Sequence, residues 1–152
     1  MNETKFVVFQ LEGDKFGIPI DAVERIMADQ KPTRIPRTPA MLLGVFDLRG
    51  EAVAAVDLRL RFDFPERPGT ANFIVVTSER GRVALRVDKV DGIMALEEGS
   101  IEDSPEMLRT KDDDFMSGVA KNGEELIVLL EPDNVIPKSM RKTILKVEAA
   151  AA

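Results

Sequence analysis

The stretch FVVFQLEGDKFGIPIDAVERIM, residues 6–27, decides the fold, because FIVVTSERGRVALRVDKVDGIM, residues 73–94, repeats its pattern without a gap. The offset is 67 residues (73 minus 6), so that Phe6 matches Phe73. A second, looser match follows downstream, where Gly44-Val45 and Gly50-Glu51 recur as Gly118-Val119 and Gly123-Glu124. A self-match over this many positions indicates an internal duplication rather than a shared propensity.

Each repeat holds short β-type runs with turn signals between them. Residues 6–11 and 16–18 flank the turn residues 12–15, which predicts a hairpin. A second hairpin is predicted from residues 44–49 and 52–58, around a turn at Gly50-Glu51.

The residues between these two hairpins change their pattern. Apolar side chains at helical spacing predict a short helix over residues 20–27, with Asp21 as its N-cap. Three prolines then make residues 29–40 an extended connector or an edge strand.

About 70 residues with four or five short strands are too few for a sandwich with a large core, whereas a small closed barrel suits them. We therefore expect an all-β chain of two similar barrels side by side, with short helical segments. The alternative is one sandwich of eight to ten strands. The expected division is one domain over residues 1–145, with subdomains at about 16–68 and 72–137. The first strand and the C-terminal segment are open to exchange between barrels, and residues 146–152 are expected to form a disordered tail.

Composition excludes much enzyme chemistry. The 152 residues include no Cys and no His, which removes thiolate nucleophiles, His-based triads and the usual zinc sites. There is no Trp or Tyr, and the net charge is −6, which argues against nucleic acid as the main partner. The absence of a long apolar run or a signal-like N-terminus predicts a cytoplasmic protein.

Two charged regions remain as candidate sites. Acidic side chains concentrate between residues 97 and 114 and include Asp112-Asp113-Asp114, so a carboxylate-based enzyme stays open as a minor alternative to a solvated loop. Basic side chains concentrate between Lys31 and Arg67, which leaves a nucleic-acid-binding barrel as a further alternative to surface ion pairs.

The block Gly44-Val45-Phe46-Asp47-Leu48-Arg49-Gly50, followed by Val56-Asp57-Leu58-Arg59, resembles the CheW family of chemotaxis adaptor proteins. Residues 16–23, 84–90, 118–120 and 126–130 support the resemblance, which extends from Lys5 to about Pro137. It implies a fold of two small SH3-like β-barrels packed together, in agreement with the duplication.

The resemblance also implies a function. It is that of a non-enzymatic scaffold without a cofactor, which couples membrane chemoreceptors to the histidine kinase CheA. The implied partners are the cytoplasmic tip of the receptors and the regulatory domain of the kinase, with no nucleic acid and no direct membrane insertion. The implied location is the cytoplasm, at membrane receptor arrays. The alternative within the family is a divergent CheW-like paralogue that serves another chemosensory or kinase pathway.

Carried over by position, the receptor-binding residues are Ile20, Val23 and Arg49, and the kinase-binding residues are Arg34, Ile35 and Gly44. Ile20 and Val23 are also candidates for the core. Arg49 has no counterpart at the equivalent turn of the second repeat, residues 121–123, which favours a role specific to the first barrel. The sequence leaves open whether Asp47 pairs with Arg49.

Overall fold

The computed structural model describes residues 3–66, 69–79, 81–102 and 115–151. Its strands are β1 (Glu3–Leu11), β2 (Asp14–Pro19), β3 (Val23–Ala28), β4 (Leu42–Leu48), β5 (Glu51–Asp57), β6 (Asn72–Ser78), β7 (Gly81–Val87), β8 (Lys89–Glu97), β9 (Ile101–Glu102), β10 (Met116–Asn122) and β11 (Glu125–Leu130). Its helices are α1 (Leu58–Arg61) and α2 (Lys138–Ala151), with 3₁₀ turns η1 (Ile20–Ala22), η2 (Glu98–Ser100) and η4 (Pro132–Asn134).

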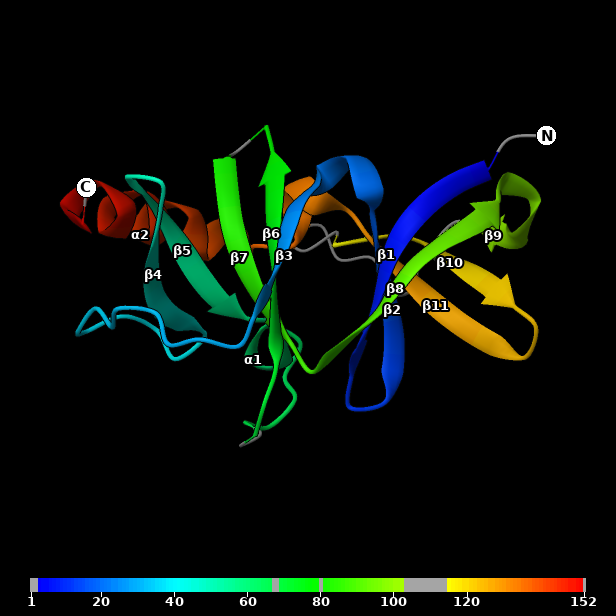
Figure 1. The fold of residues 1–152 in the computed structure, drawn as a ribbon, viewed down its shortest axis with the longest axis horizontal. Helices are drawn as coiled ribbons and strands as arrows, with labels where there is room; N and C mark the ends of the chain where they lie inside the picture. Colours follow the sequence, from blue (N-terminus) through cyan, green and yellow to red (C-terminus); the bar gives the residue numbers. More distant parts are fainter. Residues whose placement is uncertain (1–2, 67–68, 80, 103–114, 152) are drawn as a thin grey trace.

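The strands form two sheets that lie side by side (Figure 1). Sheet A has the order β8-β1-β2-β11-β10-β9, and sheet B has the order β3-β6-β7-β5-β4. The expected all-β class, with two barrels next to each other and few helices, is confirmed. Both predicted hairpins are present, as β1–β2 and β4–β5.

The first hairpin of each repeat lies in the sheet of the other repeat. Strands β1 and β2 complete sheet A, while β6 and β7 complete sheet B. The expected subdomains, 16–68 and 72–137 with only the first strand and the C-terminal segment exchanged, are therefore corrected: whole hairpins are exchanged reciprocally. Helix α2, from the end of the chain, packs against β4 and β5 of sheet B.

Strand pairing follows the duplication. Phe6 pairs with Met94 across β1 and β8, and Phe73 pairs with Met27 across β6 and β3. These pairs are equivalent, since both partners shift by 67 residues (73 minus 6 and 94 minus 27). Each ladder also has a bulge at the same position of the repeat, so the two barrels are related by an approximate two-fold symmetry.

Three clusters of buried side chains hold the barrels together. One fills the interior of each barrel: Phe46 and Phe73 meet edge to face in sheet B, and Phe6 and Val8 belong to the corresponding cluster in sheet A. The third and largest is shared, because it draws side chains from both sheets and from α2. Since β1 contributes to an interior cluster and to the shared cluster, residues 6–9 are buried without alternation.

The predicted helix over residues 20–27 is wrong beyond its first turn. Residues 20–22 form the 3₁₀ turn η1, whose three-residue repeat explains the spacing of Ile20 and Val23. Residues 23–28 are strand β3, paired with β6. The bulge leaves Glu24 without a partner in the ladder, and this extra residue interrupts the alternation expected of a strand.

The expected disordered tail, 146–152, is also corrected through residue 151. These residues belong to α2, where Met140, Ile144 and Val147 are buried against the shared core. Their spacing of four and three residues is that of a helix face. The spacing of these three apolar residues would therefore have predicted the helix from the sequence.

Candidate functional site

Arg49 stands at the tip of the β4–β5 hairpin. Arg49 and Gly50 form a two-residue turn with φ values of 54° and 85°, the left-handed combination that matches the twist of a hairpin. The Gly50 N–H donates to Oδ1 of Asp47 at 2.8 Å, so the Asp47 carboxylate closes the turn. Among the described residues, Asp47 forms no ion pair with Arg49, which is exposed. The guanidinium is thus exposed to solvent.

An open hollow of about 560 Å³ lies beside this tip. Nη2 of Arg82 donates to Oε2 of Glu24 at 2.7 Å, and Nη1 of Arg82 bonds to Glu51. The hydrogen bond from Arg82 lowers the pKa of Glu24, against the effect of burial. Arg82 bonds to both carboxylates, while Arg49 forms no salt bridge in the described part of the chain and acts on Glu24 only at longer range. The lining consists of Glu24, Arg25, Leu48, Arg49, Glu51 and Arg82.

Ile20 and Val23 occupy a different position from Arg49. Both are half-buried and pack against the shared core from η1 and the start of β3. Val23 pairs with Val76 of β6, one residue before the Glu24 that lines the hollow. Strand β3 therefore contributes Glu24 to the lining of the hollow. Ile20 and Val23 are not part of the lining, and each is partly buried in the core and partly exposed to solvent.

Of the other three predicted residues, Arg34 and Ile35 belong to the connector between β3 and β4, and Gly44 belongs to β4. Arg34 is exposed, and Ile35 packs partly into the shared core. Gly44 is buried beneath the connector, where Thr33 exchanges two backbone hydrogen bonds with Val45, at 2.8 and 2.9 Å. A Cβ atom on Gly44 would lie 2.1 Å from the Thr33 carbonyl oxygen. The absence of a side chain at Gly44 thus allows the connector to pack closely against β4. Gly44 itself has no side chain that could contact a partner.

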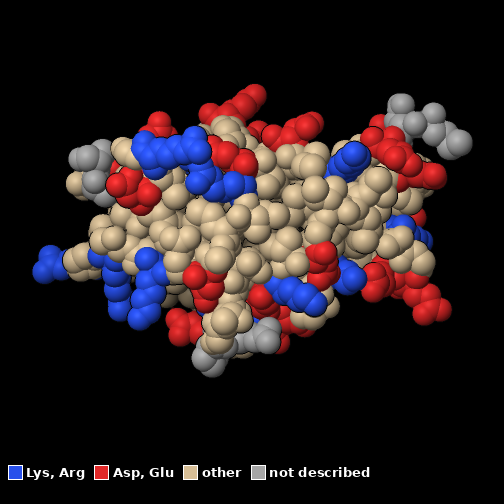
Figure 2. All heavy atoms as spheres, in the orientation of Figure 1, with Lys and Arg blue, Asp and Glu red and all other residues tan. Residues whose placement is uncertain are grey.

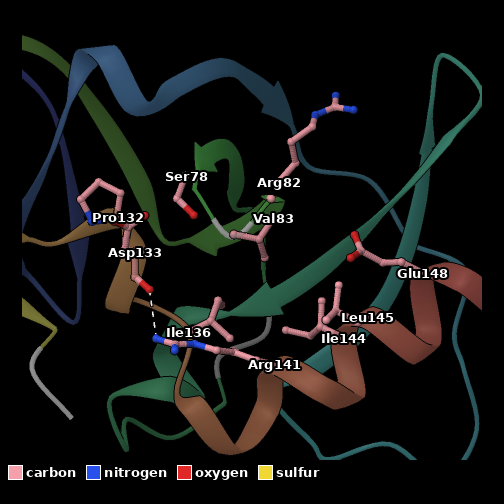
Figure 3. A pocket seen from close by; sticks show the side chains of 11 residues that line it. Ser78, Arg82, Val83, Pro132, Asp133, Ile136, Arg141, Ile144, Leu145 and Glu148 are labelled. Carbon is pink, nitrogen blue, oxygen red and sulfur yellow. Dashed lines mark hydrogen bonds between the residues drawn. The ribbon is translucent and has the colours of Figure 1, made fainter. Parts of the chain in front are cut away.

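A further cavity, of about 290 Å³, lies between α2 and the β6–β7 turn (Figure 3). Arg141 lies at one side of it and donates from Nη2 to the Asp133 carbonyl oxygen at 3.1 Å. On the α2 side are Ile144, Leu145 and Glu148, and Leu145 is 62% exposed. This cavity was not predicted from the sequence, because α2 was not expected.

The acidic region shows no catalytic arrangement in its described part. Glu97, Glu98 and Glu102 are exposed. The remaining acids of this region, including Asp112-Asp113-Asp114, lie outside the described residues. Within the described ranges, no group of three or more acidic side chains is placed to hold a metal ion. In the same ranges, no helix is long and apolar enough to cross a membrane.

Fold and surfaces together define a class of paired β-barrels with exchanged hairpins and with exposed basic side chains at surface hollows. The model of the CheW-like domain family matches residues 5–140, and the chain belongs to that family. The resemblance seen in the sequence is thereby confirmed.

Similar proteins agree with this assignment. Chemotaxis protein CheW of Bacillus subtilis is 27% identical over 147 residues, which cover 95% of this chain and 94% of that protein. Chemotaxis protein CheW of Rhizobium meliloti is 29% identical over 140 residues, with coverage of 91% and 90%. The crystal structure of the scaffolding protein TtCheW from Thermoanaerobacter tengcongensis matches with a TM-score of 0.78 at 31% identity. It covers 86% of this chain and 90% of that one, and supports the SH3-like character of both barrels.

Proposed function

We propose that this chain is a non-enzymatic scaffold of bacterial chemotaxis that couples chemoreceptors to the histidine kinase CheA. Membership of the CheW-like domain family over residues 5–140 is the observation that carries the proposal. Relatives named chemotaxis proteins, and a solved relative named a scaffolding protein, support the same role. Under this proposal the protein works in the cytoplasm, at receptor arrays.

The receptor surface is assigned to Arg49 together with the half-exposed sides of Ile20 and Val23. An exposed guanidinium without a counter-ion is suited to a charge-assisted hydrogen bond with a carboxylate. Ile20 and Val23 offer apolar contact to one face of a helix. The receptor tip that fits this surface is therefore a helix with an acidic residue beside its apolar stripe.

The kinase surface is assigned to the connector, with Arg34 and Ile35 as contacts and Gly44 as the residue that seats it. A hollow of about 670 Å³ opens there. Its lining combines apolar and charged side chains, the mixture typical of a protein interface. The residues are Arg34, Ile35, Pro36, Arg37, Thr38, Pro39, Ala40, Leu42, Leu43 and Glu66.

Receptor binding is tested with Arg49→Ala. We expect a loss of roughly tenfold or more in affinity for a receptor cytoplasmic fragment, because the charged contact lies at the interface. Alanine meets the same left-handed backbone as arginine, so the unfolding curve stays near that of the parent. Lys121→Ala is the control, since Lys121 is another exposed cation beside a hairpin turn, with 61% of its side chain exposed. Unchanged binding by Arg49→Ala would remove Arg49 from the receptor surface.

Kinase binding is tested by calorimetric titration with the regulatory domain of CheA from the same genome. The proposal expects saturable one-to-one binding. Absence of binding to any CheA of that genome would instead favour the alternative, a divergent paralogue with another kinase or receptor as its client.

A further inference from the structure

We infer that the connector of residues 29–41 is a preformed cationic surface that selects an acidic face on its partner kinase. The inference rests on the proposed function, because it takes the kinase regulatory domain as the partner. It goes beyond that function by stating the charge of the surface that the partner must present. The residues of this chain that contact that surface are Lys31, Arg34 and Arg37.

Three cations lie on the connector, and the lining of the hollow beside them includes one carboxylate, that of Glu66, so a net positive charge remains. All three are exposed, and none forms an ion pair within the part of the chain that the structure describes. The one acidic residue of the connector, Asp29, faces Arg86, whose Nε lies 4.0 Å from its Oδ1. The chain as a whole carries a net charge of −6. A local excess of positive charge on an acidic protein directs an approaching partner to this surface.

The space-filling view in Figure 2 shows where this positive charge lies on the surface. Basic side chains project at the end of the molecule that carries β4 and the connector (Figure 2; connector in cyan in Figure 1). They surround the hollow of about 670 Å³, in which Leu42 and Leu43 supply apolar lining. The partner surface that fits is an apolar contact bordered by carboxylates.

The connector is held in place before any partner binds. Pro32, Pro36 and Pro39 restrict its backbone. Thr33 is joined to β4 by its two backbone hydrogen bonds, and Oγ1 of Thr38 donates to the Ile35 carbonyl oxygen at 3.0 Å. A surface that is already ordered loses little conformational entropy on binding. Arg34 and Arg37 are therefore carried on a fixed frame, at either side of the Ile35-Pro36 pair.

The backbone at Arg37 adds a second, independent observation. Its φ is 64°, in the left-handed region that glycine adopts most easily. The side chain at this position is exposed and makes no ion pair in the described ranges. A role in contact with a partner accounts for a cation held there.

The test is a charge reversal, Arg34→Glu with Arg37→Glu, titrated against the CheA regulatory domain at low and at moderate salt. The matched control reverses the exposed Lys142 and Lys146 of α2 and changes the net charge by the same amount. We expect the connector variant to lose at least about tenfold in affinity at low salt and the control to lose less than about twofold. The difference shrinks as salt is added. Circular dichroism and unfolding curves establish that both variants are folded.

The outcomes separate the two proposals. If the parent does not bind the kinase domain, the proposed function fails. If the parent binds and both variants bind with equal affinity, the proposed function stands and the charge inference is overturned. A parallel titration with random-sequence duplex DNA covers the other anionic partner: loss of DNA binding by the connector variant, with kinase affinity unchanged, would also overturn it.

Discussion

Nη1 of Arg59 lies 2.6 Å from Oδ2 of Asp88, and Nη2 of the same guanidinium bonds to Glu12. Arg59 belongs to α1, whereas Glu12 lies in the β1–β2 turn and Asp88 where the chain leaves β7 for β8. Only 2% of the Arg59 side chain is exposed. Desolvation acts to lower the pKa of Arg59, but Glu12 and Asp88 outweigh it and the pKa is raised. One buried cation thus joins α1 to a turn within sheet A and to the point at which the chain passes from sheet B to sheet A.

Removing this cation destabilises the protein. Arg59→Met removes the buried guanidinium from Asp88 and Glu12, and breaking this buried ion pair costs about 3–5 kcal/mol of unfolding free energy. Lys121→Met breaks the exposed pair with Glu102 and costs less than about 1 kcal/mol. Urea unfolding at neutral pH measures both. Equal effects would mean that the Arg59 pair contributes no more than a surface contact.

Gly44→Ala displaces the connector. The added Cβ meets the Thr33 carbonyl oxygen at 2.1 Å, on top of the strain of a φ of 146°. We expect a lower unfolding midpoint and faster hydrogen exchange at the amides of Thr33 and Val45. Gly50→Ala is the control, with a φ of 85° and open space around its Cβ. If Gly44→Ala keeps the exchange protection of these amides, close approach is not what requires glycine there.

Two neighbouring residues of α2 differ in burial, so substituting each in turn distinguishes core packing from a surface contact. Ile144 is 7% exposed and Leu145 is 62% exposed. Ile144→Ala removes buried methyl groups from the shared core and costs about 2–4 kcal/mol, whereas Leu145→Ala stays within about 0.5 kcal/mol of the parent. Denaturant unfolding distinguishes the two. Comparable small effects would show that α2 does not contribute to the shared core in solution.

The Glu148 carboxyl makes stability depend on pH. Burial raises its pKa above the ordinary value of 4.5, although Oε2 accepts the Ala54 N–H at 3.1 Å. The folded chain therefore holds a proton that the unfolded chain releases, and this stabilisation is full below about pH 4.5 and lost as pH rises through the folded-state pKa.

Glu148→Gln keeps an oxygen for the Ala54 N–H and removes the buried charge. We expect the variant to be more stable than the parent at pH 7, with a gain that shrinks as the pH falls toward 4. Thermal unfolding of both proteins across this range gives the comparison. Glu125→Gln, at an exposed glutamate, gives the background. A gain that is constant with pH would exclude titration of Glu148 as its cause.

The strands of the two predicted hairpins followed from local pattern, but β3 and the assignment of strands to sheets did not. Phe6 pairs with Met94 and Phe73 with Met27 in the same register, so the duplicated sequences would satisfy pairing within each repeat equally well. Nothing in the alternation of side chains distinguishes the two arrangements. Whether the hairpins are exchanged depends on the connections between them and on the shared core. Both are features of the tertiary structure and not of the local sequence.

The candidate site was predictable only in part. The sequence predicted the hairpin but put its turn at Gly50-Glu51, with Arg49 ending the strand, whereas the turn is Arg49-Gly50, one residue earlier. It did not show that Asp47 bonds to Gly50 instead of Arg49, or that Gly44 admits the connector, because each depends on a contact in space. The short helix was expected at Ile20 because a 3₁₀ turn and a bulge together imitate helical spacing.

The exchanged hairpins also impose an order on folding during synthesis. Strands β3 to β7 complete sheet B once residue 87 has left the ribosome. The β1–β2 hairpin is made first, yet β2 pairs with β11 through Phe16 and Val128, which are 112 residues apart (128 minus 16). Contacts this distant in sequence form late, and an unpaired apolar hairpin is open to aggregation until they do. Among the described strands, β1 and β2 are therefore translated before the others and enclosed after them, and the nascent chain is most vulnerable at this hairpin.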